Sequence, residues 1–222
     1  MIVKINKLKI WVSFLFLIVI TIGCSSGPSP EEEVYATLEN VVSLEESFKE
    51  QQDPLVELEN SEKAIYDEII SLSMKDFDKI VSLSAEAIAL VEERENRINN
   101  EHESIQSAKS EFETVGSHIE MIEDTDLKKE AEGLVELMNR RYSAYEDLYT
   151  NYTNALTYDK ELYQLFQNED LSIEILEEQI NSINESYEEV IKANNQFNEI
   201  TDTYNKAKVK FYENAELNIV YE

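Results

Sequence analysis

Apolar residues recur along most of this chain at alternating intervals of four and three residues, and this pattern limits the fold more than any other feature. One series begins with Val34, Leu38 and Val41, and another runs from Leu127 to Phe166. Such spacing places the apolar side chains on one face of an α-helix and is typical of coiled-coil packing. Only 4 Gly and 3 Pro occur among 222 residues, so few tight turns are expected. The pattern predicts an all-α protein.

Capping residues mark the expected starts of two helices. Ser29, Pro30 and Glu32 have the order of a capping box with proline at the first helical position. Ser73 and Asp76 give a second capping signal further along the chain. Helices should therefore begin near residues 30 and 74.

Other residues predict breaks and later starts. Pro54 lacks a backbone donor, so a kink or a new helix is expected there. Gly116 is expected to end the helix that follows Ser73 and Asp76. Asp124 or Thr125 can cap the next helix, and Ser172 can cap the last one.

These boundaries predict segments of roughly 40 residues, each about 60 Å long as a helix. Between residues 127 and 166 a second apolar stripe runs beside the first, so this helix should touch more than one neighbour. Short connections make consecutive helices antiparallel. We expect an elongated antiparallel bundle of three or four long, coiled-coil-like helices spanning residues 30–222.

Four polar residues fall on the apolar stripes: Arg94, Arg141, Asn194 and Lys208. Polar residues at such positions can set helix register at some cost in stability. We expect Arg94 and Arg141 to pair with acids on neighbouring helices, although the sequence does not identify which acids. A binding pocket is the less favoured interpretation.

The N-terminus has the composition of a signal peptide. Three lysines precede a largely apolar run from Ile10 to Ile22, which is too short to span a bilayer comfortably because a spanning helix needs ~20 apolar residues. The run ends in Thr21-Ile22-Gly23-Cys24, which resembles the lipobox of bacterial prolipoproteins, although leucine is usual where Thr21 stands. That resemblance implies cleavage between Gly23 and Cys24 and a diacylglyceryl group on the Cys24 sulfur. The alternatives are an ordinary signal peptide with a chance cysteine, or an uncleaved anchor.

This interpretation divides the chain into a signal peptide at 1–23, a lipidated cysteine and tether at 24–29, and a helical domain at 30–222. Two acyl chains make membrane anchoring stable where one does not. No later segment is apolar enough to span a membrane. We therefore expect the body to lie on the extracytoplasmic face of the cell membrane.

The charge of the body excludes several partners. The chain has a formal net charge of −28, and without the three signal-peptide lysines 16 basic residues oppose 47 acidic ones, a net charge near −31. Such a surface repels nucleic acids and anionic headgroups. The hydrophobic residues, 42% of the chain, are periodic, which argues against disorder.

Catalytic and metal-binding motifs are missing from the sequence. The glycines do not form a Gly-x-Ser-x-Gly or phosphate-binding motif, and the only cysteine is Cys24. His102 lacks the second histidine of a zinc helix, and His118 falls in an expected turn. Asp124 and Asp126 begin like a calcium loop, but its glycine and final glutamate are missing, so a capped turn is favoured. We expect no enzyme, no metal and no cofactor.

Four tyrosines share a broad helix face: Tyr142, Tyr145, Tyr149 and Tyr152. If they are exposed, they form a ligand-contact face that stacks on sugar rings or peptide stems. If they are buried, they are core residues whose hydroxyls reach its edge. The core interpretation is favoured.

Several stretches together carry a family resemblance. Besides the lipobox they are Val41–Glu45, Gln51–Leu55, Met74–Asp78, Ile183–Glu188 and Ala193–Asn198. The set resembles the YkyA-like family of cell-wall-binding lipoproteins of Bacillus and its relatives, over essentially the whole chain. The resemblance implies a Gram-positive host and a location between membrane and wall. It transfers no site residue, and the hydrolase region suggested for the family finds no catalytic motif here.

The leading hypothesis is a membrane-anchored, non-enzymatic lipoprotein whose helical body binds or organises peptidoglycan, wall polymers or other envelope components. Because the body is acidic, contact with anionic wall polymers would need divalent-cation bridges, while aromatic faces or peptidoglycan amines offer other routes. The alternative is a module that binds another envelope protein, as a chaperone or regulator of exported proteins. A wall hydrolase is less favoured than either.

The Cys24→Ala substitution is expected to abolish lipid attachment, because this thiol is the only acceptor for a thioether-linked lipid in the chain. The protein should be released from the membrane or left unprocessed, while its body stays helical. Metabolic labelling with a fatty-acid analogue and membrane fractionation measure this. Label that persists in the Cys24→Ala protein would contradict lipidation at this residue.

Overall fold

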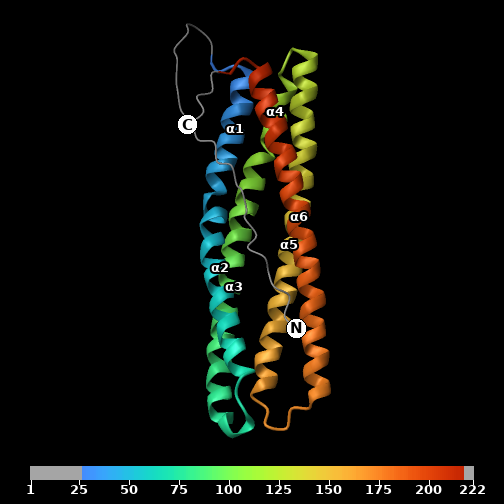
Figure 1. Ribbon diagram of the computed structural model, residues 1–222. Helices are drawn as coiled ribbons and strands as arrows, with labels where there is room; N and C mark the ends of the chain where they lie inside the picture. Colours follow the sequence, from blue (N-terminus) through green and yellow to red (C-terminus); the bar gives the residue numbers. More distant parts are fainter. Residues whose placement is uncertain (1–26, 218–222) are drawn as a thin grey trace. The chain divides into compact units, whose positions relative to one another are not determined.

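The computed structural model describes residues 27–217, so Cys24 and the predicted signal peptide lie outside the described part. Within this range the chain is helical and contains no strand. The helices are α1 (Pro30–Leu44), α2 (Glu46–Ile69), the 3₁₀-helix η1 (Met74–Asp76), α3 (Phe77–Phe112), α4 (Val115–Glu120), α5 (Thr125–Phe166) and α6 (Ile173–Asn214) (Figure 1). Four are long, with 24 residues in α2, 36 in α3 and 42 each in α5 and α6. The predicted all-α class is confirmed.

The described chain divides into two compact units. Unit 1 comprises Glu45–Ile105 and Tyr145–Asn194, and unit 2 comprises residues 27–44, Gln106–Ala144 and residues 195–217. The helices α3, α5 and α6 each contribute a segment to both units. Among the described helices none is apolar over a stretch long enough to traverse a lipid bilayer.

Consecutive long helices of unit 1 run in opposite directions, as the pairing of their side chains shows. The pairs are Phe48–Ser104 and Glu62–Arg94 for α2 and α3, His102–Glu146 and Glu92–Lys160 for α3 and α5, and Glu161–Gln179 and Asp159–Tyr187 for α5 and α6. In each case a later residue of one helix meets an earlier residue of the next. The predicted antiparallel arrangement is therefore confirmed within this unit.

Unit 2 is organised around α1, whose apolar stripe is almost fully buried. Val34, Leu38 and Val41 are each at most 2% exposed. Helix α1 packs against α4, and the ring of Tyr35 meets that of Tyr212 on α6 edge to face, with centroids 5.0 Å apart. The four-and-three spacing of the sequence thus marks the core face of α1.

All four predicted caps are present, and at the start of α6 the Ser172 Oγ accepts the amide of Ile175 over 3.3 Å. Ser29 and Glu32 form a reciprocal capping box: the Glu32 amide donates to Ser29 Oγ over 3.2 Å, and the Ser29 amide donates to Glu32 Oε2 over 2.8 Å. At η1 the Ser73 amide donates to Asp76 Oδ2 over 3.4 Å in the corresponding way. Asp124 Oδ1 accepts two backbone amides at the start of α5, each over 2.9 Å. Asp124, rather than Thr125, is therefore the cap.

Of the two alternatives expected at Pro54, a kink or a new helix, the new helix is wrong, because α2 continues through this residue. The boundary lies nine positions earlier, at Glu45, where φ is −85° and ψ is 4°. Ser104 of α3 explains why α2 can start there: its Oγ accepts the amide of Phe48 in the first turn over 3.2 Å. An acceptor from another helix thus supplies a partner that the local sequence does not.

The expectation that Gly116 ends the third segment is also wrong. Helix α3 ends at Phe112, and Gly116 lies inside the short helix α4 without a positive φ. The turn before α4 depends on Thr114, whose hydroxyl donates to the Glu111 carbonyl oxygen over 2.8 Å. A hydroxyl that bonds to the backbone can replace a left-handed glycine at a helix end.

Candidate functional site

A buried arginine stands at the centre of unit 1. Arg94 takes the place of an apolar residue on α3, between the buried Val91 and Ile98, and is only 2% exposed. Its guanidinium is surrounded by three acids and three tyrosines from α2, α5 and α6. We call this set with Arg94 the Arg94 cluster: Glu59, Glu62, Arg94, Tyr152, Asp159, Tyr163 and Tyr187.

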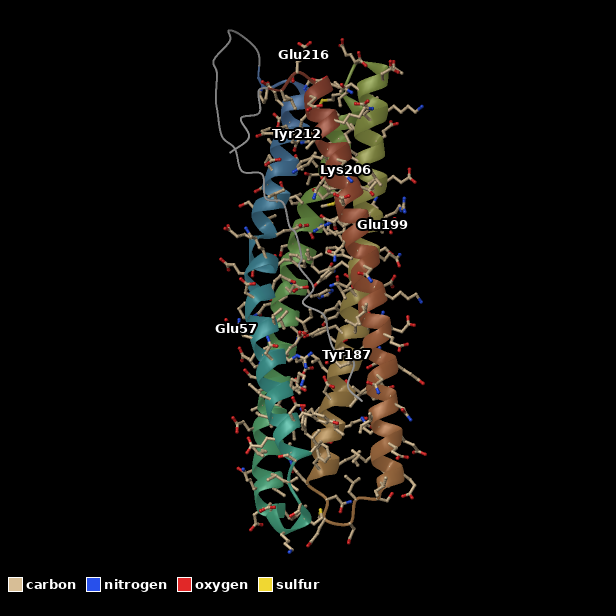
Figure 2. All side chains as sticks on the ribbon, in the orientation of Figure 1. Glu57, Tyr187, Glu199, Lys206, Tyr212 and Glu216 are labelled. Atoms are coloured by element: carbon tan, nitrogen blue, oxygen red, sulfur yellow. The ribbon has the colours of Figure 1, made fainter. Side chains whose placement is uncertain are left out.

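Each carboxylate in the cluster accepts one tyrosine hydroxyl and one guanidinium N–H. The hydroxyl bonds are Tyr152 to Glu59 at 2.8 Å, Tyr163 to Glu62 at 3.1 Å and Tyr187 to Asp159 at 2.5 Å. Arg94 donates to the same three acids over 3.4, 2.5 and 3.2 Å. It also donates to Tyr152 and to Tyr187, which reaches the cluster from α6 (Figure 2).

The cluster contains more negative than positive groups. Burial raises the pKa of Glu62 to about 7, although Arg94 and Tyr163 act in the opposite direction. Burial also raises the pKa of Asp159, against the influence of Arg94 and Tyr187. Desolvation disfavours the charged form of each acid more than one arginine can offset. Glu62 therefore titrates near neutral pH.

Each N–H group of the guanidinium has an acceptor. The three tyrosine hydroxyls of the cluster each donate a hydrogen bond to a carboxylate. A group that is fully occupied inside the protein is not available to a substrate. The arrangement instead joins four helical segments at one point, which is the role that a polar residue on an apolar stripe best fulfils. The expectation that Arg94 pairs with acids on neighbouring helices is confirmed.

A third buried acid, Glu101, lies on α3 two turns beyond Arg94. Glu101 is 2% exposed and accepts the side-chain amide of Gln52 over 2.5 Å. Burial raises its pKa to about 8, although hydrogen bonds from Tyr145 and Gln52 act in the opposite direction. Next to it, the His102 ring stacks on Tyr149 with centroids 4.1 Å apart.

Unit 2 has its own buried cations. Lys208 on α6 pairs with Glu39 on α1 over 3.2 Å, and the same carboxylate oxygen accepts the Tyr212 hydroxyl over 2.8 Å. Arg141 on α5 donates to the Thr201 hydroxyl over 3.1 Å and lies 4.9 Å from the centroid of the Phe197 ring. Asn194, the remaining polar residue on an apolar stripe, is half-buried in unit 1.

The tyrosine face predicted from the sequence lies mainly in the core. Tyr142, Tyr145 and Tyr152 are 2%, 0% and 8% exposed, so their rings are not available to stack on a ligand. Tyr149 is half-buried, and its hydroxyl donates to Asn99 over 2.8 Å. The structure thus gives these four residues the packing role that the sequence favoured.

The two histidines, and the stretch from Asp124 that begins like a calcium loop, take part in helix packing and capping. His102 Nε2 lies 3.2 Å from Glu146, and His118 is a half-buried residue of α4 rather than of a turn. Asp124 is occupied as the α5 cap. Within residues 27–217 no three histidine, cysteine or acidic side chains are grouped so as to hold a metal ion.

Sequence reasoning missed the acids that surround Arg94. Glu62 stands between Leu58 and Ile65, and Asp159 stands between Ala155 and Leu162, in each case where the apolar series skips a turn. Glu101 fills a similar gap on α3. A charged residue in such a gap was therefore a signal of burial, as Arg94 was.

These features define an all-α bundle protein in which arginine, lysine and acidic side chains meet inside the core. Residues 29–214 match the YkyA family, described as "Putative cell-wall binding lipoprotein", and the chain belongs to this family. The protein is 36% identical over 203 residues to the uncharacterized lipoprotein YkyA of Bacillus subtilis (strain 168), with 91% of each chain covered.

A solved structure shares the fold. It is the crystal structure of a conserved protein of unknown function from Staphylococcus aureus, with a TM-score of 0.59, 14% sequence identity, and coverage of 85% of this chain and 98% of that one. At this identity the likeness concerns the fold alone.

Replacing Arg94 with methionine is expected to destabilise the protein by about 3–5 kcal/mol, because buried acids lose their cation. Arg94→Lys keeps the charge but not the planar set of five donors, so it should lie between wild type and Arg94→Met. Urea unfolding followed by circular dichroism measures both. A loss below about 1 kcal/mol for Arg94→Met would show that the cluster adds little to stability.

The raised pKa of Glu101 predicts that the free energy of unfolding depends on pH. Its folded pKa of about 8 exceeds the ordinary 4.5, so its contribution to stability is complete below pH 4.5 and is lost as pH rises through 8. The loss is on the order of 3–5 kcal/mol. In Glu101→Gln, which does not titrate, the unfolding free energy should fall less between about pH 5 and about pH 9.

The matched control is Glu57→Gln, at an exposed acid on the outer side of α2 (Figure 2). This variant should keep the wild-type pH profile. Parallel profiles for wild type and Glu101→Gln would show that Glu101 is not the source of the dependence.

Proposed function

We propose that this protein is an extracytoplasmic lipoprotein, anchored through a lipid on Cys24, whose helical body binds cell-wall material without catalysing a reaction. Family membership supports wall association. The observation that carries the non-enzymatic part is the Arg94 cluster, in which the guanidinium and the hydroxyl donors end on partners inside the protein.

The short N-terminal segment supports a position close to the membrane. Five residues separate Cys24 from the first helical residue, Pro30, and an extended chain spans about 3.3–3.6 Å per residue. The start of α1 would therefore remain within about 20 Å of the anchor. Such a tether keeps the body of the protein in the space between membrane and wall.

A second candidate function is binding of another envelope protein. Exposed apolar side chains occur at two connections of unit 1: Ile70 and Met74 are 57% and 58% exposed, and Ile173 is 70% exposed. The rings of Tyr66 and Phe166, near the ends of α2 and α5, lie 6.3 Å apart, so both connections belong to one end of this unit. Apolar groups at such an end suit a protein partner.

Sedimentation with purified cell walls tests the proposed function. The mature lipoprotein, kept soluble in detergent, should pellet with walls and should stay in the supernatant without them. Loss of binding with a chelator would identify divalent-cation bridges to anionic polymers, because both surfaces are negative. Binding that survives the chelator would point to uncharged wall components or to peptidoglycan amines.

Absence of wall retention with or without calcium and magnesium would contradict the proposed function. A pull-down from a membrane extract then tests the second candidate, with an Ile173→Glu variant as the matched control. Capture of a protein that Ile173→Glu fails to capture would support the protein-partner function.

A further inference from the structure

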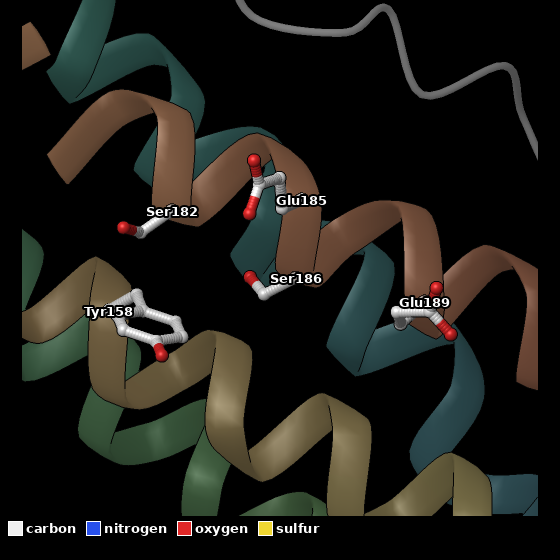
Figure 3. Close-up of a pocket in the computed structure, with 5 residues that line it drawn as sticks. All are labelled: Tyr158, Ser182, Glu185, Ser186 and Glu189. Atoms are coloured by element: carbon white, nitrogen blue, oxygen red, sulfur yellow. The ribbon is translucent and has the colours of Figure 1, made fainter. Parts of the chain in front are cut away.

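An open depression in unit 1 brings an exposed tyrosine of α5 next to one side of α6. It has a volume of about 230 Å³ and is lined by Tyr158, Ser182, Glu185, Ser186 and Glu189 (Figure 3). The four α6 residues recur at intervals of three and four, so they share a helix face. The small serine side chains leave space beside the Tyr158 ring. The space exceeds several water volumes of about 30 Å³ each, enough for a small ring-shaped ligand.

Tyr158 is distinctive among the aromatic side chains. Within residues 27–217 it is the one aromatic residue that is exposed, at 37%, while the others are buried or half-buried. The backbone beside this ring is tied to α6, because Gln179 donates to the Tyr158 carbonyl oxygen over 2.8 Å and to Glu161 over 3.2 Å. An aromatic face that is open to solvent can pack against the C–H face of a ligand ring.

The polar groups around the ring act mainly as acceptors. The Ser182 and Ser186 hydroxyls donate to carbonyl oxygens of their own helix, over 3.1 and 2.9 Å. Their oxygens still have lone pairs, and the Glu185 and Glu189 carboxylates accept hydrogen bonds. Glu189 also pairs with Lys192 over 3.2 Å, and both of these side chains are exposed. A matching ligand must therefore bring hydrogen-bond donors and a flat apolar face.

The charge of the protein further restricts the class of ligand. The body carries a net charge near −31, so anionic polymers are repelled at this site as elsewhere. A neutral sugar chain is not repelled by this charge, and its hydroxyl and amide groups are hydrogen-bond donors. We propose that the Tyr158 depression binds a neutral pyranose unit of a glycan strand, stacked on Tyr158 and donating hydrogen bonds to Glu185 and Glu189. This inference rests on the proposed function and names the wall component involved.

The test uses the mature lipoprotein in a detergent without a sugar headgroup and the neutral tetramer of N-acetylglucosamine as probe. Saturation-transfer NMR and calorimetry measure binding. Wild type should bind, and Tyr158→Ala should weaken binding about tenfold or more. Tyr158→Phe keeps the ring and should stay within about twofold of wild type. Ile175→Ala, which removes a 49% exposed side chain elsewhere on α6, should bind as wild type does.

Added salt should leave binding unchanged, because the probe is uncharged. Circular dichroism melts establish that each variant is folded. The inference is overturned if wild type shows no transfer to the tetramer, if Tyr158→Ala binds as well as wild type, or if salt abolishes binding.

Wall sedimentation of the same variants separates this inference from the proposed function. Retention of wild type together with release of Tyr158→Ala supports both. Equal retention of the two proteins overturns the glycan site and leaves the proposed function standing. If neither protein is retained, the proposed function fails, and the tetramer titration alone decides the glycan site.

Discussion

The guanidinium of Arg94 is the point on which the order of unit 1 depends, because side chains from α2, α3, α5 and α6 all meet there. Apolar stripes alone favour contact between helices but tolerate a shift along their length. A planar group with five donors has a fixed geometry, and a shifted helix would leave a buried acid or hydroxyl without its partner. The cluster therefore specifies one alignment of the four segments. Buried ion pairs are weak evidence for stability but good candidates for such a role.

A related arrangement of buried side chains occurs in unit 2. Lys208 and the Tyr212 hydroxyl meet on one oxygen of Glu39, which links α6 to α1. In both units an acid receives a cation and a tyrosine together. This combination suits a chain with 47 acids and 19 basic residues, because each scarce buried cation is supplemented by neutral hydroxyl donors. The tyrosines of α5 are thus needed inside the bundle, both as apolar bulk and as hydrogen-bond donors.

This use of the tyrosines limits where a ligand can be held. The polar groups of the Arg94 cluster are occupied by one another, and acidic residues far outnumber basic ones in the chain. The wall binding that we propose therefore needs a surface position where an aromatic ring and hydrogen-bond acceptors lie together. Tyr158 and the facing side of α6 meet that requirement. The description of the YkyA family supports the proposed association with the cell wall. The likeness to the Staphylococcus aureus protein concerns the helical fold.

The sequence by itself determined the all-α class, the caps at Ser29, Ser73, Asp124 and Ser172, and the apolar face of helices such as α1. A residue such as Val41, Ser29 or Asp124 acts through its own helix, so spacing and local chemistry suffice to place it. The same reasoning placed Arg94 on an apolar stripe and predicted that acids on neighbouring helices pair with it. Only the tertiary structure decided its partners, because Glu62 and Asp159 reach it from other helices through an alignment that no local pattern encodes. It also moved the α2 boundary to Glu45, since the acceptor for that first turn is Ser104, 56 residues from Phe48 in the chain.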